Sequence, residues 1–216
     1  MNKIFEIGLS HTGTTSLNDA LNMLGIKSCH CPLDETTYKE VSGGKYELTV
    51  LKHYQAITDV TAVPIYPQLD KTYPGSKFIW TIREKQAWLK SMARVNEMWL
   101  TYLHKSTWQK FWIQFREDRP LQGRKPALKS AWNRVQTDKC LELNRLLTFG
   151  GLAFQDESRL SYVYDQHHRN VSDYFKDRQQ DLLVIDICQG DEWEKLCPFL
   201  DKAIPAKSFP HAISQR

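Results

Sequence analysis

The chain has 216 residues, of which 41% are hydrophobic and 25% charged, which is the ordinary composition of a soluble globular protein. Its formal net charge of +4 suits an anionic ligand but is too small to indicate a nucleic-acid surface. No apolar run approaches the roughly 20 residues of a membrane span, and the N-terminus lacks the layout of a signal peptide.

Short apolar runs alternate with segments of helical periodicity along the chain. In order, the predicted elements are a strand at 3–9, a helix at 14–25, a strand at 27–31, a helix at 34–41, a strand at 54–60, a helix at 64–71, a strand at 77–82, helices at 86–103, 126–149 and 157–176, a strand at 182–187 and a helix at 192–200. This alternation predicts one domain over residues 1–216, an α/β fold of three layers in which helices flank a central, mainly parallel sheet of about five strands.

The turn between the first strand and the first helix carries the clearest motif. Gly8 and Gly13 have the spacing of a P-loop, G-x-x-x-x-G-K-[ST], but Thr14 stands where the lysine belongs. Amides at a helix start favour an anion, and hydroxyls beside them can help to hold a phosphate. Those hydroxyls belong to Thr12, Thr14, Thr15 and Ser16. We therefore predict a P-loop NTPase-like fold whose phosphate site is adapted away from ATP hydrolysis; a hydroxyl-rich helix N-cap is the alternative.

Two more polar residues stand at the ends of predicted strands. Asp59 closes the strand at 54–60, and Arg83 follows the strand at 77–82, with Ser91 eight positions later in the next helix. Ligands of parallel α/β sheets bind at the carboxyl ends of the strands, so we expect these residues and the loop at 8–16 on one rim. A surface salt bridge is the alternative for Arg83, and a turn cap is the alternative for Asp59.

These motifs resemble those of sulfotransferases that use 3′-phosphoadenosine 5′-phosphosulfate (PAPS) and release 3′-phosphoadenosine 5′-phosphate (PAP). Residues 7–17 resemble the 5′-phosphosulfate loop, and more narrowly the loop of short P-loop sulfotransferase-like proteins, which usually reads Pro-Arg-Thr-Gly-Thr-Thr-Ser. Residues 77–91 resemble the strand, arginine and serine that hold the 3′-phosphate, and residues 193–211 resemble the closing segment. The late Arg-Lys-Gly stretch of cytosolic sulfotransferases is not visible in this sequence.

The resemblance implies in-line transfer of a sulfuryl group from PAPS to a hydroxyl or amine of a small molecule, without a metal. It assigns the cofactor to Ser10, His11, Thr12, Gly13, Thr14, Thr15, Ser16, Arg83 and Ser91. Many larger sulfotransferases are Golgi membrane proteins, so the missing span favours a cytoplasmic protein. No membrane or nucleic-acid partner is expected, and a homodimer is left open.

His11 and Asp59 are the expected catalytic residues. His11 stands where the family has lysine or arginine, and in its protonated form it would stabilise the leaving oxygen or donate a proton to it. Its alternative role is only to line the loop. Sulfotransferases use histidine, glutamate or sometimes aspartate as the base, which favours Asp59; His53 and Glu35 are the rivals.

Residues 99–126 combine aromatic and basic side chains and are interpreted as a lid or insertion over the acceptor. A helical core stripe with a solvated basic face is the alternative. The expected residues of the acceptor pocket are His53, Trp99, Trp108, Trp112, Tyr164 and His167.

The five cysteines are odd in number and irregularly spaced, which predicts free thiols. Cys29, His30 and Cys31 have no second ligand pair, so no metal site is predicted. Two other functions stay open. One is a P-loop kinase, against which Thr14 counts. The other is a protein that binds PAP with little turnover, which His11 keeps open.

Overall fold

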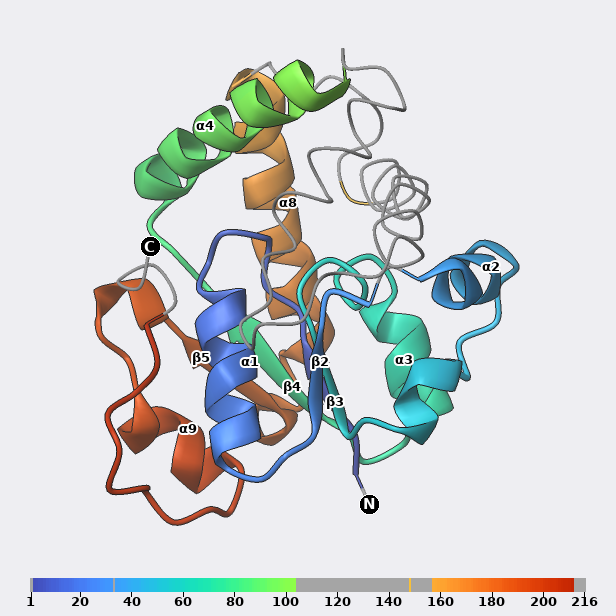
Figure 1. Ribbon diagram of the computed structural model, residues 1–216, viewed down its shortest axis with the longest axis vertical. Coiled ribbons are helices and arrows are strands. Elements are labelled where there is room, and N and C mark those ends of the chain that lie inside the picture. The colour runs from blue at the N-terminus through green and yellow to red at the C-terminus, as the bar shows by residue number, and fades with distance from the viewer. Residues whose placement is uncertain (1, 33, 104–147, 149–156, 212–216) are drawn as a thin grey trace, which may run out of the picture.

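The computed structural model describes residues 2–32, 34–103, 148 and 157–211, and for residues 95–103 it describes the helix backbone. The strands form one parallel sheet in the order β2-β3-β1-β4-β5 (Figure 1). They are β1 (Ile4–Glu6), β2 (Ser28–His30), β3 (Ala56–Thr58), β4 (Lys77–Thr81) and β5 (Leu182–Ile185). Phe5 at the centre of the sheet is in register with Ile57 of β3 and Phe78 of β4.

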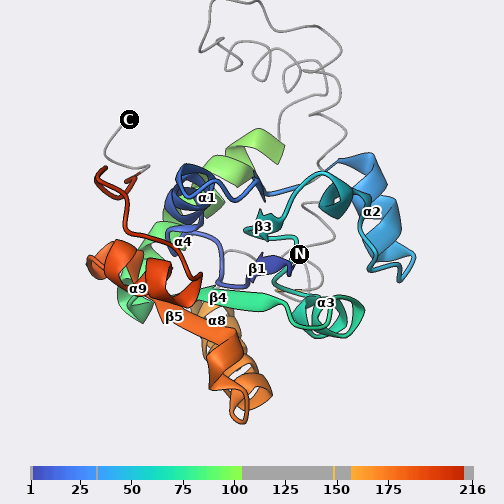
Figure 2. The same ribbon diagram turned by 90° about the horizontal axis from the view of Figure 1, so that it is seen from below.

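Helices cover both faces of this sheet, as Figure 2 shows. The α-helices are α1 (Thr14–Met23), α2 (Glu35–Ser42), α3 (Tyr66–Thr72), α4 (Lys85–Leu103), α8 (Glu157–Phe175) and α9 (Trp193–Phe199). Short 3₁₀ helices are η1 (Thr49–Lys52), η2 (Gln179–Asp181) and η3 (Ile187–Gln189). The result is the three-layer α/β fold of the P-loop type that the sequence predicts.

Alternation along the strands creates two separate cores. Ile4 faces a cluster that includes Leu21 of α1 and Leu196 of α9. The next residue, Phe5, faces the other side, where it joins Leu69 of α3 and Phe175 of α8. This period-two pattern of buried residues on both faces is the signature of a parallel sheet covered by helices.

A third cluster ties α4 to α8 above the carboxyl ends of the strands. Its buried members are Leu9, Val63, Trp88, Leu89, Met92, Leu160, Val163 and Tyr164. Because Leu9 and Val63, from the segments that follow β1 and β3, belong to this cluster, α4 and α8 are packed onto the rim where ligands of such sheets bind.

All five predicted strands and six of the predicted helices are confirmed, with shorter strands than expected. The predicted helix at 126–149 and most of the predicted lid at 99–126 lie outside the described residues. Cys29, Cys31, Cys188 and Cys197 form no disulfide with one another. Within the described ranges, no helix is both long and apolar enough to cross a membrane.

Candidate active site

Residues 8–16, called the loop below, join β1 to the first turn of α1. Gly13 is the N-cap of α1 and has φ of 99°, a left-handed conformation that glycine adopts without strain. An added Cβ at Gly13 would lie 3.1 Å from Cβ of Ile187 in η3. Among the described residues no side chain caps α1, so the partial positive charge of its first turn is directed at the rim.

Gly8 is required by close approach rather than by its dihedral angle. A Cβ there would stand 2.1 Å from Oγ1 and 2.3 Å from the carbonyl oxygen of Thr81. The start of the loop therefore lies directly against the end of β4. Both glycines of the predicted motif have a physical role in the geometry of the turn.

Arg83, two residues beyond β4, reaches back to the loop. Its Nη1 donates a hydrogen bond of 3.1 Å to the His11 carbonyl oxygen. The Tyr164 hydroxyl donates a 2.7 Å bond to the Arg83 carbonyl oxygen, which fixes the backbone from which this side chain extends. Arg83 Nε is buried and has no hydrogen-bond partner among the described residues. The Arg83 guanidinium, with hydrogen-bond donors still available for a ligand, thus lies beside the first turn of α1, on the rim that the sequence predicts.

Asp59 lies across the loop from Arg83, directly after β3. Its Oδ1 accepts a 2.8 Å hydrogen bond from the Ser10 hydroxyl. Ser10 is held in turn by Trp88 of α4, whose indole Nε1 donates 2.9 Å to the Ser10 carbonyl oxygen. Asp59 has φ of 70°, an uncommon conformation for a residue other than glycine. Such outliers cluster at functional sites, where surrounding contacts hold them in place.

His30, the last residue of β2, is a member of this site that the sequence reasoning missed. Its Nε2 lies 3.5 Å from Asp59 Oδ2 and 3.3 Å from the Thr15 hydroxyl. Its Nδ1 lies 2.9 Å from the Thr58 hydroxyl. From the sequence, His30 is considered only as a metal ligand. The available signal was its place at the carboxyl end of a strand that neighbours the strand of Asp59.

Glu6 is the second missed residue, and it lies beneath the loop with none of its surface exposed. The Gly8 amide donates 2.6 Å to its Oε1, and the Asp59 amide donates 2.6 Å to its Oε2. The Thr81 hydroxyl lies 2.7 Å from Oε1. Burial raises the pKa of Glu6 to about 8, and the neighbouring Asp59 carboxylate acts in the same direction. One carboxyl group therefore connects the ends of β3, β1 and β4.

His11 stands at the top of the loop with φ of 70° and an exposed side chain. Desolvation by the surrounding chain lowers the pKa of His11; Asp59 opposes this shift and Arg83 adds to it. The imidazole is therefore mainly neutral at pH 7.5, unlike a lysine or arginine side chain at this position.

The loop hydroxyls do not all face the rim. The Thr12 hydroxyl donates 2.6 Å to the Leu9 carbonyl oxygen and lies 2.5 Å from the Thr81 hydroxyl, and its residue is 2% exposed. The expectation that this hydroxyl would hold phosphate is wrong, because it is used inside the protein. Thr14 and Ser16 are also buried, whereas Thr15 is exposed.

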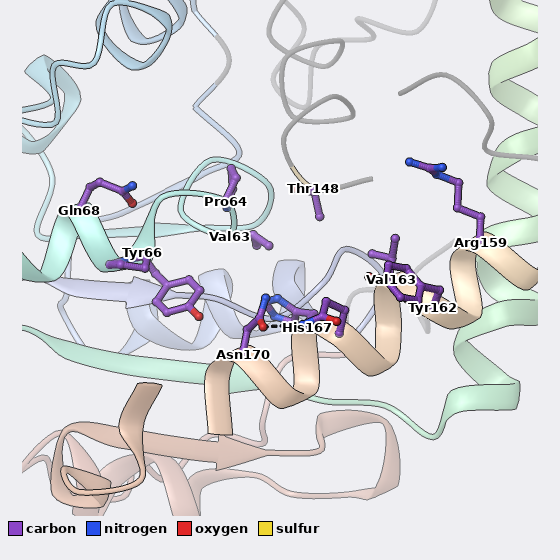
Figure 3. Close-up of a pocket in the computed structure, with 12 residues that line it drawn as sticks. Val63, Pro64, Tyr66, Gln68, Thr148, Arg159, Tyr162, Val163, His167 and Asn170 are labelled. Carbon is purple, nitrogen blue, oxygen red and sulfur yellow. Dashed lines mark hydrogen bonds between the residues drawn. The ribbon is translucent and has the colours of Figure 1, made fainter. Parts of the chain in front are cut away.

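A pocket of about 450 Å³ opens beside this rim, between the start of α3 and α8 (Figure 3). It is lined by Val63, Pro64, Tyr66, Pro67, Gln68, Thr148, Arg159, Tyr162, Val163, Gln166, His167 and Asn170. His167 Nε2 donates 2.8 Å to the Ile7 carbonyl oxygen, directly before the loop. Burial lowers the pKa of His167 to about 4, so the ring is neutral and this wall of the pocket is fixed to β1.

Three of the predicted site residues are placed differently. His53 precedes β3 and is exposed before the amino end of that strand, whereas Asp59 follows its carboxyl end. Glu35, the first residue of α2, is exposed and pairs with Lys39 at 2.9 Å. Tyr164 supports Arg83 and does not line the pocket.

The other predicted residues remain expectations. Ser91 lies half-buried in the second turn of α4, the helix that starts two residues after Arg83. The side chain of Trp99, and Trp108 and Trp112 as a whole, lie outside the described residues.

Comparison with known proteins identifies the family of this chain. A family model described as a sulfotransferase domain matches residues 3–216. The chain belongs to this sulfotransferase domain family. Among similar proteins is the Ava biosynthesis cluster protein M of Aspergillus versicolor, which is 27% identical over 230 residues, covering 97% of this chain and 80% of that protein. This sulfotransferase-family chain therefore matches its relatives across nearly its whole length.

Proposed function

We propose that this protein transfers a sulfuryl group from PAPS to a hydroxyl or amine of a small molecule. The observation that carries the proposal is the Arg83 guanidinium, which bonds the loop backbone beside an uncapped helix start. A helix start favours one phosphate, and the arginine fork favours a second. The two ends of a bisphosphorylated adenosine carry such a pair.

In this proposal the donor binds across the rim. The 5′ end takes the amides of the loop and the exposed hydroxyl of Thr15, and the 3′-phosphate takes Arg83 together with Ser91. Thr12 contributes its backbone and not its hydroxyl. Membership of the sulfotransferase domain family supports PAPS as the donor, and the Arg83 Nε, which has no partner among the described residues, supports an additional anion at this position.

Asp59 is proposed as the base that takes the acceptor proton. Its Oδ1 is held by Ser10, and its Oδ2 faces His30, so the carboxylate is oriented from two sides. His11 lies beside the proposed position of the leaving oxygen. The acceptor occupies the pocket between α3 and α8, which begins four residues after Asp59 and is fixed to β1 through His167. Transfer from this arrangement relies on positioning and charge stabilisation.

Binding and transfer test the proposal separately. Purified protein is titrated with PAP and, in a parallel experiment, with ATP and Mg²⁺, and its thermal unfolding is followed. We expect PAP to raise the melting temperature and MgATP to leave it unchanged. Transfer of labelled sulfate from PAPS to a panel of phenols, alcohols and amines then identifies the acceptor. Stabilisation by MgATP alone would replace the sulfotransferase proposal with the P-loop kinase.

A second candidate is a family member that binds PAP with little turnover. The specific observation in its favour is His11, whose lowered pKa removes a fixed cation from the loop. PAP binding in the absence of transfer to any member of the acceptor panel would favour this function. Transfer that gains speed as the pH falls would instead favour catalysis assisted by a protonated His11.

A further inference from the structure

Glu6 and two threonines form a continuous chain of short contacts beneath the loop. The chain runs from Glu6 Oε1 to the Thr81 hydroxyl over 2.7 Å, to the Thr12 hydroxyl over 2.5 Å, and to the Leu9 carbonyl oxygen over 2.6 Å. Its members come from β1, the end of β4 and the loop. At 0%, 0% and 2% exposure, Glu6, Thr81 and Thr12 have no contact with solvent that could supply an alternative partner.

The number of hydroxyl protons along this chain indicates whether the carboxyl group of Glu6 is protonated. The Leu9 carbonyl oxygen can only accept, so the Thr12 proton is used there. If Thr81 supplies the proton between the two hydroxyls, it has none to give to Glu6; if Thr81 instead donates to Glu6, the contact between the hydroxyls is left without a proton. Three contacts need three protons, and the two threonines supply two of them. The third belongs to the carboxyl group of Glu6.

We propose that Glu6 is a positioning residue that acts in its protonated form, holding the loop in its ligand-binding shape through Thr81 and Thr12. Loss of this proton forces Thr81 to turn toward Glu6 and leaves the contact between the hydroxyls without a proton. It also puts a buried negative charge beneath a loop that binds phosphate. The ligand in this inference rests on the proposed function.

The surroundings of Glu6 favour the neutral form. Burial and the Asp59 carboxylate of β3 disfavour its charged form, and together they outweigh the hydrogen bonds from the Thr81 hydroxyl and the Gly8 and Asp59 amides, which favour that form. At the rim above, Asp59 and Arg83 act on the pKa of His11 in opposite directions. The raised pKa of Glu6, about 8, agrees with the proton count and places the loss of this proton in an accessible pH range.

Isothermal titration calorimetry with PAP tests the inference between pH 7 and pH 9.5, where both PAP phosphates are fully charged. A bound polyanion opposes ionisation of Glu6, so the wild-type Kd is expected to rise about tenfold from pH 7 to pH 9. At pH 8.5, titrations in buffers of different ionisation enthalpy should detect uptake of about half to three-quarters of a proton.

Two variants separate this effect from general pH dependence. Glu6→Gln cannot ionise, so its Kd should be nearly flat over the same range, whatever its absolute affinity. Glu40→Gln is the matched control: Glu40 is 7% exposed and also holds an amide and a hydroxyl, those of Thr49, but it lies on α2 and its pKa is lowered. This control should keep the wild-type slope. Equal slopes in the wild type and Glu6→Gln would overturn the inference.

Other outcomes are equally decisive. If Glu6→Gln does not fold, the absence of proton uptake by the wild type at pH 8.5 overturns the inference. If PAP does not bind at all, the proposed donor is wrong, and infrared spectroscopy of the ligand-free wild type then tests Glu6 alone. A band of a protonated carboxyl group at pH 7 that disappears by pH 9.5 supports the inference, and a spectrum without that band contradicts it.

Discussion

Replacing Arg83 with alanine should weaken binding of PAP much more than binding of adenosine 5′-phosphate. Arg83 uses one of its donors on the His11 carbonyl oxygen, and its buried Nε has no partner in the part of the chain that the structure describes, so at least two donors can serve a phosphate. Hydrogen bonds between charged groups contribute about 1.5–3 kcal/mol each, so two of them correspond to about 3 kcal/mol or more. The Kd for PAP should therefore rise by roughly 150-fold or more.

Adenosine 5′-phosphate lacks the 3′-phosphate, so its affinity measures the contribution of Arg83 to binding apart from any contact with that phosphate. Loss of the bond to the His11 carbonyl costs about 0.5–1.5 kcal/mol at most, so this ligand should lose about tenfold or less. Calorimetry of both ligands with the wild type and Arg83→Ala gives the coupling between this side chain and the 3′-phosphate directly. Arg94→Ala, which removes an exposed arginine from the same helix as Ser91, is the control and should leave both affinities unchanged.

An equal loss for the two ligands would refute the reasoning. It would mean that Arg83 acts only by shaping the loop and that the 3′-phosphate lies elsewhere. The result would not remove the chain from the sulfotransferase domain family, but it would remove the guanidinium from the donor site.

His11→Lys places a fixed cation in the loop and should raise the single-turnover rate at pH 7.5 about tenfold. Because the pKa of His11 is lowered, the wild-type rate should rise as the pH falls from 8 to 6, whereas the rate of the lysine variant should not change over this range. Asp59→Asn should lower kcat by about 10²–10⁴ with little change in the KM of the acceptor, and a rate within twofold of the wild type would exclude Asp59 as the base. Gly13→Ala forces a side chain into a left-handed conformation 3.1 Å from Ile187, so urea denaturation should detect a loss of about 1–3 kcal/mol, and an unchanged midpoint would contradict the strain. Folding raises the pKa of Glu6 from 4.5 to about 8, so the protonated carboxyl group contributes fully to stability below pH 4.5, and this contribution is lost as the pH rises through 8. The free energy of unfolding should therefore decline by at most about 5 kcal/mol. Glu6→Gln should flatten this decline in unfolding curves measured from pH 5 to pH 9.

The fold was predictable because its signals are local. Apolar runs bounded by Gly, Pro and polar turns mark the strands, and Asp34 before α2 is the helix cap that its sequence suggests, accepting bonds from the Thr36 and Thr37 amides. Strands came out shorter than predicted because the residues after β1 and β3 leave the sheet to form the rim. The 3₁₀ helices carry no periodicity long enough to detect.

The candidate site was predictable in part, for a physical reason. The order of strands brings β1, β3 and β4 together, and the rule for parallel sheets then places the loop, Asp59 and Arg83 on one rim. What sequence cannot give is the direction in which a side chain points. Thr12 was expected to face a ligand and faces Thr81, and His53 was expected near the site and lies before the amino end of β3. Glu6 was hidden because a charged residue within an apolar strand gives no periodic signal of its own.

The balance of charge connects the two unusual features of this loop. A bisphosphorylated nucleotide brings several negative charges to a rim where, among the described residues of the site, Arg83 is the cation in direct contact with the loop and His11 is mainly neutral. An ionised Glu6 beneath the same loop would cancel much of that guanidinium's effect, because few water molecules can screen a fully buried charge. A loop without its usual lysine or arginine can therefore tolerate a buried carboxyl group only if that group stays protonated. On this reasoning, the neutral His11 in the loop and the protonated Glu6 beneath it are two parts of one electrostatic arrangement.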